Sequence, residues 1–201
     1  MGRKVSEFGG TALDAKSETT RRAVRFLLVL CLILVGPCLS TARWLQDANR
    51  LLRQLPQETQ DAIARNEAAG TTDSQEYRDA TNVFYRRHLC RKDPWPPELL
   101  ASLGHFGWPV YNAMWGPNEF RSSGVLRDYD RTPRLGELRL PVLFTAGRFD
   151  EATPEATAWY QSLVPGAKIA IFEKSAHMTM LEELDRYTTT VRRFQRSVET
   201  P

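Results

Sequence analysis

The sequence is poor in cysteine and in low-complexity sequence. Its three cysteines, Cys31, Cys38 and Cys90, are an odd number without CxxC spacing, which argues against a disulfide framework and a zinc site. We interpret them as apolar packing residues of a reducing compartment. No internal repeat is visible, and 201 residues suffice for one domain, or for one domain with a small inserted lid. No metal and no cofactor is expected.

The chain also has little net charge. Lys and Arg total 27 against 24 Asp and Glu. Residues 1–25 hold six of these basic residues and three of the acids, so the rest of the chain is neutral. This balance gives little support to nucleic-acid binding. A local basic cluster, RRHLCRK at 86–92, is interpreted as a solvated helix face.

A long membrane-spanning run is lacking as well. The ten apolar residues from Phe26 to Val35 are fewer than the about 20 that a spanning helix needs. With basic residues before it and small residues after it, the run has the layout of a signal peptide. A buried strand of a parallel sheet looks the same. We favour the strand and a cytoplasmic protein. The alternative is a secreted or membrane-associated protein, through residues 21–40.

The texture of the chain changes near residue 134. Helical periodicity dominates residues 41–133, with Ser40 or Thr41 as a cap, Gly70 as a terminator, and Thr72 with Gln75 at capping-box spacing. Strands are then predicted at 141–146 and 168–173, each followed by a helix. Strand–helix–strand–helix with short loops indicates a parallel α/β unit. We therefore expect an α/β fold in which 26–40 contributes a strand, 41–133 a helical cap and 134–201 the carboxyl-terminal α/β portion.

Two titratable residues follow the predicted strands directly. Asp150 follows the first strand of the carboxyl-terminal unit, and His177 follows the second, 27 positions later. Catalytic groups of open α/β sheets lie at the carboxyl ends of strands, and an aspartate followed by a histidine is the order of the α/β-hydrolase triad. Taken singly, Asp150 is better explained as a helix cap or turn former and His177 as a loop residue with its hydrogen bonds satisfied. Their joint position favours catalysis, and we expect a hydrogen bond between them.

Six segments together resemble one enzyme family. CLSTARWLQDANRLLRQLP, EAAGTTDSQEY, FYRRHLCRKDPWP, YNAMWGPNEF, TAGRFDEATP and SAHMTMLEE are similar to the second half of proline iminopeptidases. These are serine aminopeptidases of the α/β-hydrolase superfamily that release an N-terminal proline or other residue from small peptides. The resemblance runs from about Leu30 to about Phe194 and implies a partial α/β-hydrolase fold, a truncated parallel sheet with an inserted helical cap.

The resemblance also assigns roles to individual residues. It implies that Asp150 and His177 are the acid and base of a triad, and that Glu119 and Glu151 hold the free α-amine of the substrate. Two carboxylates in a water-poor pocket suit an ammonium group. Trp115, next to Glu119 in WGPNEF, is predicted to line a pocket for the proline ring, although cap core explains it as well.

The family's nucleophile is not found in this sequence. The family places its serine in GxSxG and an HGGPG-like stretch farther upstream, and neither occurs here. Ser6 in KVSEFGG departs from the elbow spacing, so the nucleophile is unknown. Residues 1–25 match nothing and are expected to be a disordered leader. We expect a truncated or rearranged hydrolase with at most trace activity alone. The alternatives are a non-catalytic binding remnant, membrane-anchored or secreted, and a chain completed by a partner.

Overall fold

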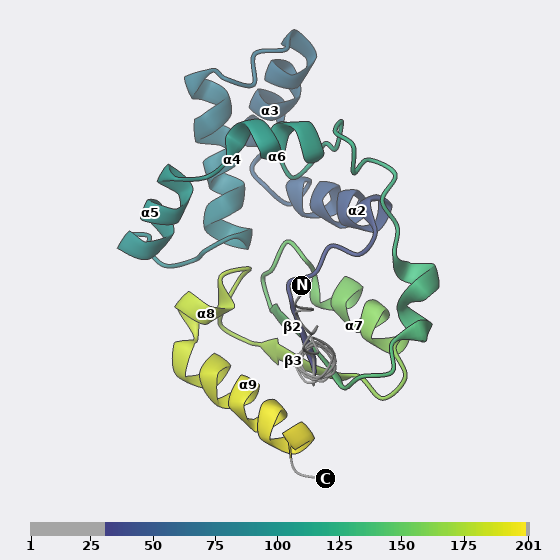
Figure 1. Ribbon diagram of the computed structural model, residues 1–201. Helices are drawn as coiled ribbons and strands as arrows, with labels where there is room; N and C mark the ends of the chain where they lie inside the picture. The colour runs from purple at the N-terminus through teal and green to yellow at the C-terminus, as the bar shows by residue number, and fades with distance from the viewer. Residues whose placement is uncertain (1–30, 200–201) are drawn as a thin grey trace, which may run out of the picture.

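The computed structural model describes residues 31–199 and contains a small parallel sheet beneath a helical cap (Figure 1). The predicted leader 1–25 and the first part of the apolar run lie outside the described residues. The elements of the lower layer are β1 (Leu32–Val35), β2 (Val142–Gly147), α7 (Pro154–Ser162), β3 (Lys168–Phe172), α8 (Thr179–Glu182) and α9 (Leu184–Glu199). The cap contains α2 (Thr41–Leu52), α3 (Gln57–Ala69), α4 (Gln75–His88), α5 (Pro97–Gly104) and α6 (Trp108–Met114), and a 3-10 helix, η1 (Thr132–Glu137), leads back to the sheet.

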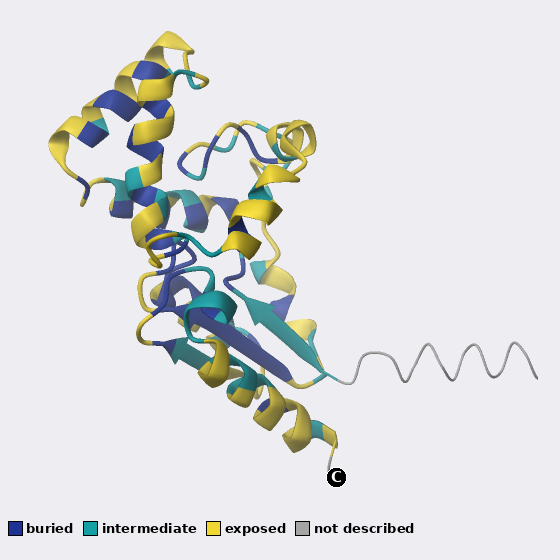
Figure 2. Ribbon diagram, turned by 90° about the vertical axis from the view of Figure 1, so that its left-hand side faces the viewer, coloured by how far each residue is buried: buried dark blue, intermediate teal, exposed yellow. Residues whose placement is uncertain are grey.

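The three strands are parallel in the order β1-β2-β3, as the sequence predicted. Leu32 pairs with Val142, and Leu143 pairs with Lys168. The helices α7 and α9 lie on opposite sides of the sheet (Figures 1 and 2). The central strand β2 is buried along its whole length, whereas β1 is half-buried because it lies at the edge of the described sheet. None of the described helices is both long and apolar enough to cross a membrane.

The helix ends follow local sequence signals, with one correction. Ser40 caps α2 by accepting a hydrogen bond from the Arg43 N–H at 3.4 Å, and Gly70 ends α3 in the left-handed conformation. The predicted cap of α4 at Thr72 is wrong, because Ser74 caps this helix by accepting from the Tyr77 N–H at 3.1 Å. Ser74 also donates to the Asn66 side chain at 2.7 Å. This bond to α3 fixes the turn and starts α4 two residues later.

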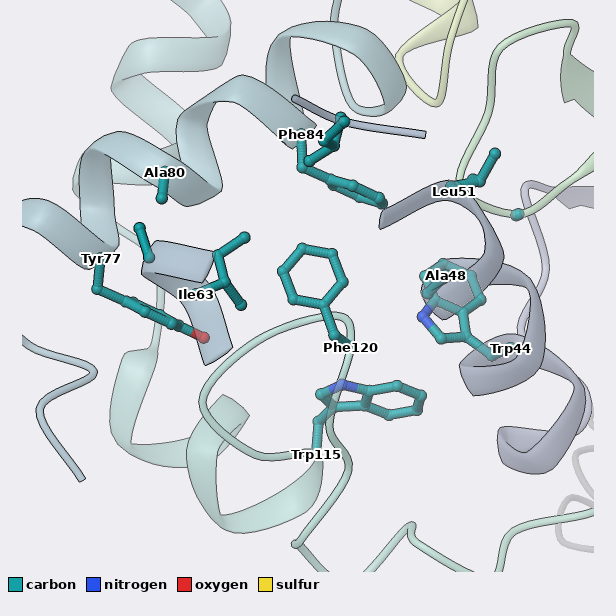
Figure 3. Close-up of a cluster of buried hydrophobic side chains, with 12 residues drawn as sticks. Trp44, Ala48, Leu51, Ile63, Tyr77, Ala80, Phe84, Trp115 and Phe120 are labelled. Atoms are coloured by element: carbon teal, nitrogen blue, oxygen red, sulfur yellow. The ribbon is translucent and has the colours of Figure 1, made fainter. Parts of the chain in front are cut away.

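The cap has a hydrophobic core of its own, built mainly from α2, α3, α4 and the loop after α6 (Figure 3). At its centre, the rings of Phe84 and Phe120 meet edge to face with centroids 4.6 Å apart, and Phe84 is fully buried. Trp44 and Trp115 form a second edge-to-face pair at 5.9 Å. Aromatic pairs in this geometry contribute more than their buried area alone. The cap is therefore a packed unit that holds its loops in place above the strand ends.

Candidate active site

Asp150 and His177 are paired at the carboxyl ends of β2 and β3. The distance from His177 Nδ1 to Asp150 Oδ1 is 2.9 Å, so the hydrogen bond predicted from the sequence is present. A carboxylate only accepts, so Nδ1–H is the donor and Nε2 is left as the basic nitrogen. Asp150 is almost fully buried, and its two oxygens also accept from the N–H groups of Ala152 at 2.8 Å and Gly147 at 3.3 Å. The carboxylate is thus fixed before it orients the imidazole.

The residue that follows β1 packs against the same pair. Gly36 follows this strand with φ +48°, and its N–H donates to the Thr145 carbonyl at 2.8 Å. A Cβ at this position would lie 2.6 Å from His177 Cε1 and 2.7 Å from Nδ1. Only glycine accepts both the left-handed backbone and this close contact. All three described strands therefore contribute to the position of the imidazole.

The cap holds the two site loops through the last residue of α4. The His88 carbonyl accepts the N–H of Glu151 at 3.3 Å and the N–H of His177 at 3.2 Å. The His88 ring is buried, and its Nδ1 donates to the Phe149 carbonyl at 2.8 Å. Carbonyls at the end of a helix have no partner within it, so the free end of α4 is suited to bind both loops. This links the cap directly to the acid–base pair.

Glu119 and Glu151 come from different parts of the chain and face one cavity. This cavity, of about 630 Å³, is lined by both carboxylates and by His177, so the predicted convergence of these residues is present. Glu119 accepts from the Tyr111 hydroxyl at 2.6 Å, while its own carbonyl accepts from the Trp44 indole N–H at 3.2 Å. Glu151 is buried, and its Oε2 has no hydrogen-bond partner within the described part of the chain, residues 31–199. An unpaired buried carboxylate oxygen requires a donor that these side chains do not supply.

The titratable groups of the site shift one another's pKa values. Burial raises the pKa of Glu119, although the Tyr111 hydroxyl and His177 oppose the shift. The pKa of Glu151 lies well above its usual range because of burial and the nearby Glu119 carboxylate. Burial by itself lowers the pKa of His177, but Asp150, Glu151 and Glu119 outweigh it and raise the pKa to about 9. A cation between the two glutamates would relieve their repulsion.

The structure corrects the placement of Trp115. Its ring is buried in the cap core against Trp44, and its indole N–H donates to the Asn118 carbonyl at 2.9 Å. Trp115 supports the loop that carries Glu119, and its side chain is not part of the cavity wall. The residue therefore packs within the cap, and we do not retain it as a substrate contact.

Sequence reasoning missed two tyrosines of the site. Tyr85 and Tyr111 line the cavity. Burial raises the pKa of both phenols, and the nearby carboxylates of Glu119 and Glu151 raise it further. In the sequence, Tyr77, Ala80, Phe84 and His88 recur at helical intervals, and Tyr85 lies one position beyond this stripe. A helix covered on two sides needs a wider apolar stripe, and this width was the available signal.

The raised pKa values predict that the fold loses stability as pH rises. The folded state binds more protons than the unfolded chain wherever its pKa is the higher one. The stability that the two glutamates contribute to the fold is fully present below about pH 4.3, the ordinary pKa of glutamate, and declines above it. The contribution of His177 is complete below its ordinary pKa of 6.5 and is lost as the pH passes about 9.

Glu151→Gln is expected to leave stability nearly unchanged at pH 5 and to raise it by about 1–3 kcal/mol at pH 9, because glutamine removes the charge whose burial opposes folding at high pH. Urea unfolding at both pH values measures this. Glu98→Gln, at an exposed position of the cap, is the control. It should not change the stability at either pH. If the stability of the wild-type protein and that of Glu151→Gln change with pH in parallel, the claim that the buried Glu151 charge destabilises the fold at high pH is contradicted.

Among residues 31–199, no group of His, Cys, Asp and Glu side chains is arranged to hold a metal ion. The titratable side chains that this site brings together are the acid–base pair and the two carboxylates. The pair can move a proton at Nε2, and the carboxylates can bind a cation beside it.

Most of the chain is similar to known proteins. No family model matches the chain. It is 43% identical over 171 residues to a proline iminopeptidase of Heyndrickxia coagulans, covering 85% of this chain and 59% of the relative. The proline iminopeptidase of Thermoplasma volcanium is 35% identical over 164 residues, covering 81% of this chain and 56% of the relative. The chain thus spans a little more than half the length of these relatives.

Two solved structures are also similar. The proline iminopeptidase of Mycobacterium smegmatis superimposes with a TM-score of 0.76 at 36% identity, covering 84% of this chain and 57% of that chain. VinJ superimposes with a TM-score of 0.81 at 36% identity over the same shares. These neighbours have the α/β-hydrolase fold, so the parallel sheet and its helices are a partial α/β-hydrolase fold, as expected from the sequence.

Proposed function

Because this chain is homologous to proline iminopeptidases over most of its length, we propose that it carries the cap and the acid–base pair of an aminopeptidase. The substrates are small peptides with a free N-terminus, and the residue released is preferentially proline. Residues 41–133 form the cap of this enzyme and residues 134–201 its carboxyl-terminal α/β portion. One observation carries the proposal: His177, paired with Asp150, lines the same cavity as two carboxylates, and Oε2 of Glu151 has no hydrogen-bond partner among residues 31–199.

In this proposal Glu119 and Glu151 bind the substrate's α-ammonium group. The secondary ammonium of an N-terminal proline offers two N–H donors, and Glu151 Oε2 is an acceptor without a partner among residues 31–199. Charge-assisted hydrogen bonds donated by the ammonium to both carboxylates fix the N-terminus and so place the first peptide bond beside His177. The rings of Tyr85 and Tyr111, on the cavity wall, supply apolar surface for the first side chain. An acetylated N-terminus lacks the charge and fits this site poorly.

His177 is the general base and Asp150 its orienting partner. The Nδ1–H to Asp150 bond holds the tautomer in which Nε2 accepts a proton from the nucleophile. In the free site, three carboxylates raise the pKa of the imidazole to about 9, which keeps it protonated at neutral pH. A bound ammonium offsets the field of Glu119 and Glu151 and therefore lowers that pKa toward neutrality. Substrate binding thus prepares the base for proton transfer.

A second candidate function is binding without catalysis. The sequence contains no GxSxG motif, and the nucleophile is not assigned to any residue described here. Serine, histidine and aspartate act as a unit, so the pair without a serine would give trace turnover at most. The amine site needs no nucleophile and would still select peptides by their N-terminus.

Titration of the 201-residue chain with matched peptides tests the amine site. A free prolyl dipeptide amide is expected to bind at least about tenfold more tightly than its N-acetylated form, because acetylation removes a charge-assisted interaction. Chemical-shift changes in NMR spectra measure both affinities even when they are weak. Equal affinity for the two peptides would remove the aminopeptidase specificity and leave a generic hydrolase portion. Release of proline from a chromogenic amide, measured in parallel, separates the catalytic candidate from the binding candidate.

A further inference from the structure

The cavity that holds the two carboxylates extends well beyond them along α4. On this helix its wall includes Arg78, Asn82, Tyr85 and Leu89, which are spaced by three or four positions and so share one helix face. From Arg78 to Leu89 the helix axis advances about 16 Å. The cavity volume of about 630 Å³ falls in the range of roughly 300–1,000 Å³ that encloses drug-sized ligands. A single N-terminal residue is much smaller and leaves the outer part free.

The outer part of the cavity is walled by exposed aromatic rings. Phe106 and Trp108, at the turn between α5 and α6, are 41% and 50% exposed and line the cavity. Their centroids lie 4.7 Å apart, and the ring of Tyr111 meets them at 5.4 and 5.9 Å. Large exposed aromatic groups gathered at one place mark binding surfaces. We call these three residues the aromatic rim.

Tyr111 connects the aromatic rim to the carboxylates. Its hydroxyl donates to Glu119 at 2.6 Å, while the other end of the same side chain contacts Trp108 at a centroid distance of 5.9 Å. The phenol of Tyr111 thus links the Glu119 carboxylate to the other two rings of the rim. An extended peptide advances about 3.3 Å per residue, so its second and third residues reach the rim when its N-terminus lies at Glu119.

We propose that the aromatic rim of Phe106, Trp108 and Tyr111 is a subsite for a bulky apolar or aromatic side chain at the second or third residue of the peptide. The inference rests on the proposed function, because the amine site sets the direction of the bound peptide. Continuity of the rim with that site favours the substrate's own chain over a separate protein as the occupant. The exposed amides of Asn82 and Asn112, on the same cavity wall, can bond the peptide groups.

Two tripeptide amides test this subsite, Pro-Phe-Phe-amide and Pro-Ser-Ser-amide, titrated into the full chain. The first is expected to bind at least about tenfold more tightly, since burial of one large apolar side chain is worth about that factor. Trp108→Ala should remove most of the difference, and Trp108→Phe should retain much of it. Trp159→Ala is the matched control, because Trp159 is 38% exposed on α7, outside the cavity wall. It should leave the difference unchanged.

The outcomes separate the subsite from the amine site. If both tripeptides bind equally, or if Trp108→Ala leaves the preference intact, the subsite is overturned whatever the amine site does. The N-acetylated forms of the same peptides test the other half. Suppose that acetylation does not change the affinities, while the wild-type protein still prefers the phenylalanine peptide and Trp108→Ala does not. The subsite then stands and the amine site fails. No detectable binding of Pro-Phe-Phe-amide overturns both.

Discussion

Glu119→Gln is expected to weaken binding of a prolyl peptide by about 1.5–3 kcal/mol, the range for a hydrogen bond to a charged group. Glu119 is one of two carboxylates in the cavity, and its Oε1 already accepts from Tyr111 at 2.6 Å. Glutamine has nearly the same shape, so the change removes charge with little change in packing. The remaining Glu151 carboxylate then holds the ammonium alone. Titration of the free peptide by calorimetry or NMR measures the loss.

The controls for Glu119→Gln distinguish recognition from folding. Glu98→Gln changes an exposed glutamate of the same cap and should not affect peptide binding. The acetylated peptide should bind the wild-type protein and Glu119→Gln with similar affinity, because it carries no charge for Glu119 to recognise. A comparable loss for both peptides would show that the substitution damages the cavity in general and would remove Glu119 from the amine site.

Gly36→Ala is expected to break the hydrogen bond between His177 and Asp150 and so lower the pKa of His177 far below its value of about 9. The added methyl group would lie 2.6 Å from the imidazole, whereas the backbone of Gly36 is held by its bond to Thr145. The ring, and not the strand, must therefore move. Without the hydrogen bond to Asp150, burial, which favours the neutral imidazole, is opposed less strongly by the carboxylates that remain around His177, including Glu119 and Glu151. NMR titration measures this directly, because the chain has only three histidines.

Gly70→Ala is the matched control for Gly36→Ala. Gly70 also has a positive φ, +70°, but a Cβ there would have no atom within 4 Å. Both variants pay the backbone cost of a left-handed alanine, about 1–2 kcal/mol, so both should lose some stability. Only Gly36→Ala should shift the titration of His177. An unchanged pKa of His177 in Gly36→Ala would refute the role of the β1 end in holding the imidazole.

The sequence by itself determined the features that depend on neighbouring residues. The apolar run of residues 142–147 is a central strand that is buried throughout. This was predictable because a continuous apolar run is typical of a strand covered on both faces. Gly70 ends its helix as predicted, and Ser40, one of the two predicted caps, begins its helix, because caps act within one turn. The order of Asp150 and His177 behind parallel strands also predicted their contact, since parallel strands bring their carboxyl ends to one edge.

Only the tertiary structure decided which distant groups meet. Glu119 and Glu151 line one cavity because the cap packs over the strand ends, and no local periodicity encodes that packing. Trp115 lies in the cap core, although its place beside Glu119 in the sequence fits a substrate contact equally well. The close approach of Gly36 to His177 joins positions far apart in the chain. Residue patterns set the elements and their faces, whereas these contacts depend on how the packed cap and the sheet fit together.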